Sequence, residues 1–220
     1  MLEELDIINI PIISTEQSAA LCAPALSCIH SIYTPCLDKT LRYARTVPYL
    51  TELRRLYTRG PIDHVLLPLF AQYCLKLDEV KFRDGSNATP THLLQLVENC
   101  RHLRTICFSN MMVLTDEILI NVAQHCPNLQ VLYLETSNKI HISDASLLAL
   151  SEHCPHLKSL DFHKCTKLTE TAALHLIQYC KQLHTLILPY KVVSEETVLR
   201  LPVTELRQHS GLILYFGRKL

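Results

Sequence analysis

Five cysteines recur at nearly constant spacing along the middle of this chain. Cys74, Cys100, Cys126, Cys154 and Cys180 are 26, 26, 28 and 26 residues apart, and a leucine follows each cysteine by three residues. A period this regular indicates that one structural unit is repeated and stacked, because a single unit of this length cannot bury its own apolar face. The spacing therefore predicts an elongated repeat architecture.

Each repeat has two halves with different hydrophobic periods. Leu103, Ile106 and Phe108 follow the pattern L-x-x-L-x-L, in which alternate side chains point to one face of a strand. The segment 118–126 (ILINVAQHC) then places its apolar residues at i, i+1, i+4 and i+5, which is one face of a helix. A strand and a helix in a period of about 20–29 residues are typical of a leucine-rich repeat.

We predict an α/β leucine-rich-repeat solenoid of the ribonuclease-inhibitor-like type, with a parallel concave sheet and convex helices. The chain is expected to form a single leucine-rich-repeat domain over 1–220, with weakly matching repeats in 1–49, clear repeats in 50–206 and a terminal strand in 207–220. Nine strand positions are predicted. Those outside the cysteine-marked region are assigned to Leu2, Leu5 and Ile7, to Leu26 and Ile29 with Cys22 near the cysteine position, to Leu50 and Leu53, and to Leu212 and Leu214.

Helix boundaries are also marked in the sequence. A hydroxyl residue followed by an acidic residue is typical of a helix start, because the hydroxyl caps a backbone N–H and the acid favours the helix dipole. Proline after Cys126 and Cys154 indicates a helix end, since proline cannot continue the helix. The predicted starts are Thr115-Asp116, Ser143-Asp144, Thr169-Glu170 and Ser194-Glu195.

The charge balance excludes some classes of partner. The chain carries 21 basic and 21 acidic residues and has no formal net charge. General nucleic-acid and anionic-membrane binders usually carry a basic excess, so neither kind of partner is expected. The N-terminal residues (MLEELDI) are acidic, where a signal peptide would be basic, and no run of 18 apolar residues occurs. We expect a cytoplasmic and/or nuclear protein. Because a repeat strand is predicted close to each end, the capping units are expected from a partner, from a dimer or from a longer chain, and we favour the longer chain.

The ten cysteines are not expected to form a disulfide framework. Equivalent cysteines in neighbouring repeats would lie about one helix-to-helix distance apart, roughly 8–10 Å. A disulfide needs Cα atoms within roughly 7 Å. Because reduced cysteine is among the most buried residue types, we interpret the row as small apolar filler of the core.

Three segments carry a family resemblance: CPNLQVLYL (126–134), ISDASLLALSEHC (142–154) and CPHLKSLDFHKCTKLTETAALHLIQYC (154–180). They resemble the cysteine-containing repeats of F-box/leucine-rich-repeat proteins, and Cys165 matches that family's cysteine after the strand. The resemblance implies a substrate receptor of an SCF-type cullin-RING ubiquitin ligase. In that family the repeats hold a protein substrate or degron peptide, and an F-box binds the Skp adaptor and through it the cullin. This chain departs from the pattern, since no F-box is recognisable in 1–50.

A binding function without ubiquitin chemistry fits the same sequence, whereas catalysis and metal binding do not. A stand-alone leucine-rich-repeat scaffold or inhibitor without a ubiquitin role would have the same repeats. Enzyme activity is not expected, because Cys107 and His163 would lie two strands apart, about 10 Å, beyond hydrogen-bond reach. His163-x-Cys165 lacks the paired ligand spacing typical of zinc, and four glycines leave little room for a phosphate-binding loop. We therefore expect no catalytic residues, no metal and no cofactor.

The partner-binding residues are predicted on the concave face of the sheet. Aligning the repeats gives three rows of outward-facing positions, which begin at Glu52, Arg54 and Leu56. A protein partner is expected to contact a basic corner and a more acidic corner beside it, since arginine and tyrosine often anchor interfaces. The predicted contact residues are Arg54, Glu79, Lys81, Arg83, Tyr133, Glu135, Asp161 and His163.

Overall fold

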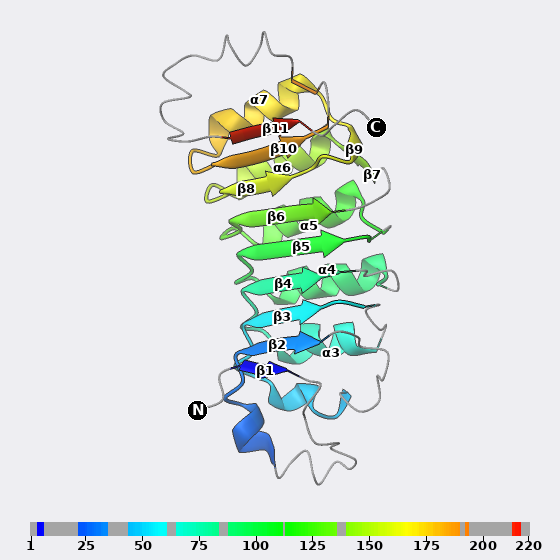
Figure 1. Cartoon of the computed structure of the whole chain (residues 1–220), viewed down its shortest axis with the longest axis vertical. Coiled ribbons are helices and arrows are strands. Elements are labelled where there is room, and N and C mark those ends of the chain that lie inside the picture. The colour runs from blue at the N-terminus through cyan, green and yellow to red at the C-terminus, as the bar shows by residue number, and fades with distance from the viewer. Residues whose placement is uncertain are drawn as a thin grey trace. The chain divides into compact units, whose positions relative to one another are not determined.

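A computed structural model describes most of the repeat region. The described residues are 4–6, 22–34, 44–60, 65–83, 88–111, 113–135, 140–189, 192–193 and 213–216. The chain divides into two compact units, Met1–Val113 and Leu114–Leu220. Each unit has the same plan, in which parallel strands form one layer and helices form the other (Figure 1).

In the first unit the strands follow one another in chain order and all pair in parallel. They are β1 (Glu4–Asp6), β2 (Ser31–Thr34), β3 (Arg55–Thr58), β4 (Glu79–Phe82) and β5 (Thr105–Ser109). The layer opposite them contains a short 3-10 helix, η2 (Val47–Tyr49), and the helices α3 (Leu66–Tyr73) and α4 (Pro90–Asn99). Successive members of this helical layer pack against each other.

The second unit repeats the arrangement with one addition. Its main parallel strands are β6 (Val131–Glu135), β8 (Ser159–Asp161), β10 (Thr185–Leu188) and β11 (Ile213–Phe216). The helices are α5 (Asp116–His125), α6 (Asp144–His153) and α7 (Glu170–Tyr179), which pack in sequence order. The addition is a separate parallel pair, β7 (Ile140–Ser143) with β9 (Cys165–Lys167). The sequence patterns did not predict this pair.

The predicted α/β leucine-rich-repeat fold is confirmed, and the described residues contain one strand for each of the nine predicted repeats, although not always at the predicted residues. The alternation of the strands is visible in burial. In β4, Val80 and Phe82 are fully buried, while Glu79 and Lys81 are only partly covered. Phe82 stacks on Phe108 of the next strand, with ring centroids 5.8 Å apart. The apolar side chains therefore fill the layer between sheet and helices, and the polar ones remain on the open face.

The cysteine row lies in that core, as predicted. All five repeat cysteines have no exposed surface, and no disulfide joins any of the nine cysteines in the described residues. The thiol of Cys180 donates to the carbonyl oxygen of Cys154 at 3.7 Å, and that of Cys100 donates to Cys74 at 3.6 Å. Burial raises the pKa of Cys126 and of Cys180 to about 12, so these thiols stay protonated at neutral pH.

The predicted register was wrong in the repeats before Cys74. Leu50 and Leu53 do not begin a strand; both are buried before β3 starts at Arg55. The amide of Leu53 donates to the carbonyl of Leu50, as the amide of Leu77 does to that of Cys74. Leu50 thus occupies the cysteine position. The alignment was three residues out because leucines at 50, 53 and 56 give the same spacing in two registers.

A leucine also takes the cysteine position one repeat earlier. This corrects the strand assignment of Leu26 and Ile29 and the placement of Cys22. Leu26 and Ile29 are buried before β2, and the amide of Ile29 donates to the carbonyl of Leu26. Leu26 therefore takes the cysteine position, whereas Cys22 is exposed. The prediction for Leu5 is confirmed, since it pairs with Ile32 in the same register as the later strands.

The terminal strand is present, but its register differs from the prediction by two residues. Leu214 pairs with Leu186 and Phe216 with Leu188, so the spacing is 28 residues and not 26. Leu212, which was assigned to this strand, lies outside the described residues. A spacing of 28 residues also separates Cys126 from Cys154, so both values occur within this solenoid.

Most helix boundaries agree with the sequence signals. Helices α3 to α7 all end one residue before a repeat cysteine. The hydroxyl of Thr169 accepts from the amide of Ala172, and that of Ser143 accepts from the amide of Ala145. Thr115 lies at the predicted start of α5, but its side chain makes no capping hydrogen bond there. The signal at Ser194-Glu195 lies outside the described residues.

Acidic residues of the first helical turn connect neighbouring repeats in the second unit. The Asp116 carboxylate accepts hydrogen bonds from the amide and hydroxyl of Ser143 and from the hydroxyl of Ser146. The Asp144 carboxylate likewise accepts from the amide and hydroxyl of Thr169. Burial would raise the pKa of Asp116, but these hydrogen bonds outweigh it, and the pKa lies below its ordinary value.

Candidate functional site

The open face of the sheet in the first unit carries side chains that do not enter the core. The pairing registers define which of them are neighbours: Glu79 lies beside Thr105, and Lys81 lies between Tyr57 and Cys107. The predicted rows agree with the pairing of β4 with β5 in this unit, and with that of β6, β8 and β10 in the second. Neighbouring parallel strands are about 4.8 Å apart, so side chains in one row are within contact distance of each other.

Arg54 was placed wrongly in its row. It lies one residue before β3, where its carbonyl oxygen accepts from the amides of Asp78 and Glu79. Tyr57, and not Arg54, is the neighbour of Lys81. The error follows directly from the three-residue shift in register described above. Arg54 lines a separate depression of about 250 Å³ together with Lys76, Asp78, His102 and Arg104.

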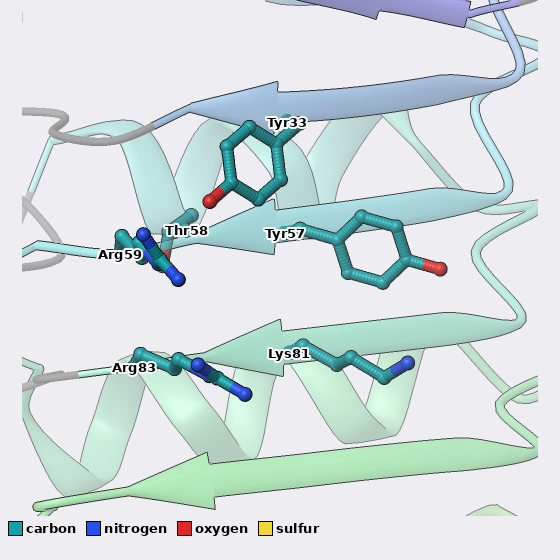
Figure 2. Close-up of a pocket in the computed structure, with 6 residues that line it drawn as sticks. All are labelled: Tyr33, Tyr57, Thr58, Arg59, Lys81 and Arg83. Carbon is teal, nitrogen blue, oxygen red and sulfur yellow. The ribbon is translucent and has the colours of Figure 1, made fainter.

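A larger depression lies over the carboxyl ends of strands β2, β3 and β4. Its volume is about 380 Å³, and it is open to solvent. Figure 2 shows that side chains from three successive strands meet there. The lining residues are Tyr33, Tyr57, Thr58, Arg59, Lys81 and Arg83. Of these, Lys81 and Arg83 were predicted, whereas the other four were missed because the register of β2 and β3 was wrong.

Glu79 binds two of the side chains that line this depression. Its carboxylate accepts a hydrogen bond from the Tyr57 hydroxyl at 2.6 Å and pairs with the Lys81 ammonium at 2.6 Å. The Lys81 nitrogen also lies 4.9 Å from the centroid of the Tyr57 ring, in cation–π range. Partial burial, and then the hydrogen bond to Glu79, raise the pKa of Tyr57, so it stays protonated at neutral pH. The charge of Lys81 is thus already balanced within the site.

Arg59 and Arg83 occupy the other side of the depression. Both are exposed, and the amide of Arg83 donates to the carbonyl of Thr58 at 2.9 Å, which aligns the two chain segments. In the part of the chain that the structure describes, no carboxylate pairs with either guanidinium. The depression therefore carries two positive charges that its own described residues do not neutralise.

The predicted acidic corner belongs to the second unit and is arranged differently. Tyr133 and Asp161 are neighbours across β6 and β8, as predicted. Asp161 is only 8% exposed, and its carboxylate accepts from the backbone amide of His163 at 3.0 Å. The same oxygen lies 2.7 Å from the Nδ1 atom of His163. Glu135 is the last residue of β6, and its side chain lies outside what the structure describes.

The described residues contain neither a metal site nor a membrane-spanning helix. Within them, no group of three or more histidine, cysteine or acidic side chains is placed to hold a metal ion. In the same ranges, no helix has the length and apolar character needed to cross a bilayer. The arrangement on the sheet face instead offers aromatic surface and arginine donors, which are the usual anchors of protein interfaces.

The fold resembles that of a solved structure. The chain is similar to one in the crystal structure of the Rad7 and Elc1 complex in yeast, with a TM-score of 0.50 and 16% sequence identity over 92% of this chain. The match covers 66% of that chain, slightly under two thirds of its length. No family model matches this chain. No curated protein matches it either.

Proposed function

We propose that this chain is a protein-interaction module that recognises the substrate of an SCF-type cullin-RING ubiquitin ligase. The depression formed by Tyr33, Tyr57, Arg59, Lys81 and Arg83 is the observation that carries the proposal. It combines aromatic surface with arginine charge that none of the described carboxylates neutralises, and arginine and tyrosine are enriched among the residues that dominate binding energy.

The connection to ubiquitin ligation rests on two likenesses. The cysteine-marked repeats resemble those of F-box/leucine-rich-repeat proteins. The similar chain in yeast comes from a complex of Rad7 with Elc1, so this fold is found in a protein assembly. On this proposal a protein substrate or degron peptide binds the open sheet face, an F-box elsewhere recruits the Skp adaptor and cullin, and the complex acts in the cytoplasm and/or nucleus. The chain itself carries no catalytic step.

The binding role is tested by charge reversal with a matched control. Proteins cross-linked to the wild-type chain in cells are compared with those cross-linked to Arg59→Glu/Arg83→Glu. The control is Arg101→Glu/Lys181→Glu, which changes the net charge equally at exposed positions outside the depression. We expect the first variant to lose its partners and the control to retain them. Equal retention by both variants would contradict binding at this face.

The ligase role is tested on the partner that depends on Arg59 and Arg83. Its half-life is measured in cells before and after depletion of the protein, with and without an inhibitor of cullin activation. A longer half-life after depletion, with no further change from the inhibitor, supports substrate recognition for degradation. An unchanged half-life would favour the alternative, a scaffold or inhibitor that binds its partner without ubiquitin chemistry.

A further inference from the structure

We infer that the depression over β2, β3 and β4 binds a phosphorylated serine or threonine side chain of the partner protein. This inference rests on the proposed binding function and specifies the chemistry that the site recognises. It is carried by the positions of Arg59 and Arg83, whose segments are joined by the hydrogen bond from the Arg83 amide to the Thr58 carbonyl. Figure 2 shows the two side chains next to each other at the ends of adjacent strands.

Two guanidinium groups at neighbouring strand ends repel each other. Like charges opposite one another on adjacent strands destabilise a sheet, and no carboxylate of the described residues offsets this pair. An anion placed between the two groups would remove the repulsion. The pair is therefore arranged for an external negative charge, and not for the stability of the free protein.

Two further polar groups of the depression are already occupied. Lys81 is paired with Glu79, and the Tyr57 hydroxyl donates to the same carboxylate. The Glu79 charge therefore faces Lys81 and Tyr57 and is largely compensated. Among the charged groups of the depression, the Arg59 and Arg83 pair remains for a ligand and gives the recognition its position and its selectivity. The buried Thr58 hydroxyl, which also lines the depression, has no hydrogen-bond partner among the described residues.

The number and geometry of these donors fit a phosphoryl group better than a carboxylate. A phosphorylated side chain carries a charge of about −1.5 to −2 near neutral pH and has three acceptor oxygens. Two arginines supply about two positive charges and forked donors that bind phosphate oxygens in pairs. An aspartate or glutamate carries a single charge and would leave one guanidinium unbalanced.

The surroundings indicate a peptide as the carrier of that group. Tyr33 is 40% exposed and lies at the rim of the depression, so it offers apolar surface to the residues that flank the phosphorylated one. The volume of about 380 Å³ accommodates one side chain with part of its backbone. A nucleic acid is disfavoured, because the whole chain has no formal net charge.

The test uses chemically defined peptide libraries with the full chain. Three libraries have the same randomised flanks and differ only at the central residue, which is phosphoserine, glutamate or serine. A single-stranded RNA oligonucleotide of similar length is the fourth probe. Retention of each probe by the immobilised chain is measured for the wild type, for Arg59→Glu/Arg83→Glu and for the control Arg101→Glu/Lys181→Glu.

We expect the phosphoserine library to be retained at least about tenfold better than the other three probes, because hydrogen bonds to charged groups typically contribute that much to an equilibrium constant. The Arg59/Arg83 variant should lose this preference and the control should keep it. Arg59→Lys/Arg83→Lys should be intermediate, since lysine keeps the charge but lacks the forked geometry.

Three results would overturn the inference. They are equal retention of the phosphoserine and glutamate libraries, retention of RNA in place of peptides, and a phosphoserine preference that survives in Arg59→Glu/Arg83→Glu. Failure here is distinguishable from failure of the proposed function. If the cross-linked partner of the previous test still depends on Arg59 and Arg83 after phosphatase treatment, the face binds a protein but does not read a phosphate.

Discussion

The two units of this protein use charged residues at their strand ends in opposite ways. In the first unit, Arg59 and Arg83 are exposed, and none of the described carboxylates pairs with them. In the second, the buried Asp161 carboxylate accepts from both the amide and the ring of His163. A charge that the fold itself compensates contributes to stability, whereas one that it leaves uncompensated is available to a partner. The sequence distinguished a basic from a more acidic corner, but not which of their charges the fold compensates.

The two units also differ in the hydrogen bonds made at the first turns of their helices. In the second unit, Asp116 and Asp144 each accept hydrogen bonds from the next repeat, so their carboxylates connect one repeat to its neighbour. In the first unit, Thr89 caps α4, and its hydroxyl accepts from the amide of His92 in the first turn of that helix. Acidic side chains of the second unit therefore connect neighbouring repeats, whereas the cap of α4 acts within its own helix.

The largest expected effect comes from the core beneath the binding face. Replacing Phe82 with alanine should lower the free energy of unfolding by about 3–5 kcal/mol, because a large buried aromatic is replaced by a cavity. Phe82 precedes Arg83, so the same variant should also weaken phosphopeptide binding. Urea denaturation and the library assay measure the two effects. Phe162→Ala, equally buried in the second unit, is the control for stability. A loss under about 1 kcal/mol at Phe82 would contradict the packing seen here.

A smaller effect is expected at the links between repeats. Asp116→Ala should lower the free energy of unfolding by about 1–3 kcal/mol, because the fully buried Ser146 hydroxyl loses its acceptor. Asp144→Ala is the matched control. Its hydrogen bonds to Thr169 are exposed, and we expect a loss below about 1 kcal/mol. Phosphopeptide binding should be unchanged in both. Equal losses in the two variants would show that burial of the hydroxyl does not determine the cost.

The lowered pKa of Asp116 predicts that the stability of the fold decreases at acid pH. Its pKa is lower in the folded protein than in the unfolded chain, so the folded state binds this proton less readily. The stabilisation is therefore present above the unfolded value, about 3.9, and is lost as the pH falls through the lower folded value. Thermal unfolding between pH 6 and pH 3 should show a smaller decline for Asp116→Asn than for the wild type. An identical decline would show that Asp116 does not account for the loss of stability at acid pH.

The smallest expected change in the free energy of unfolding comes from Arg83, and its comparison with Asp161 contrasts the strand ends of the two units. Arg83→Gln should change the free energy of unfolding by no more than about 0.5 kcal/mol in either direction, since an exposed charge that pairs with none of the described carboxylates adds little stability. Asp161→Asn should lower it by about 1 kcal/mol, because a buried acceptor of two hydrogen bonds is weakened. Chemical denaturation of the two variants gives the comparison. A larger loss at Arg83 than at Asp161 would reverse the interpretation of both sites.

Much of the fold was predictable from the period of the sequence. The cysteine spacing and the L-x-x-L-x-L pattern predicted the strands, the helices and the burial of the cysteine row, because each feature repeats the same local physics. Burial of Cys74, which has no exposed surface, required only that a small apolar residue recurs at a helix end. The side-by-side rows from Glu79 onwards were equally predictable, since the register follows from a constant repeat length.

The candidate site was less predictable, and the reason is specific. Leucines at 50, 53 and 56 allowed two registers that bury apolar residues equally well in the sequence pattern. Only the pairing of Tyr57 with Lys81 distinguishes them, and that pairing is a contact between residues 24 positions apart. A three-residue error in register replaced Tyr57 and Arg59 with Arg54 and Leu56 in the predicted rows.

The sequence by itself determined the repeat, its two-layer plan and the residues that fill the core, because hydrophobic periodicity acts over one turn or one strand. The tertiary structure alone decided which charged groups are compensated. Lys81 and Arg83 are both basic and lie two positions apart, yet Lys81 is paired with Glu79 and Arg83 lies beside Arg59. Electrostatic balance depends on distances between side chains of different repeats, and those distances are set only when the strands are in register.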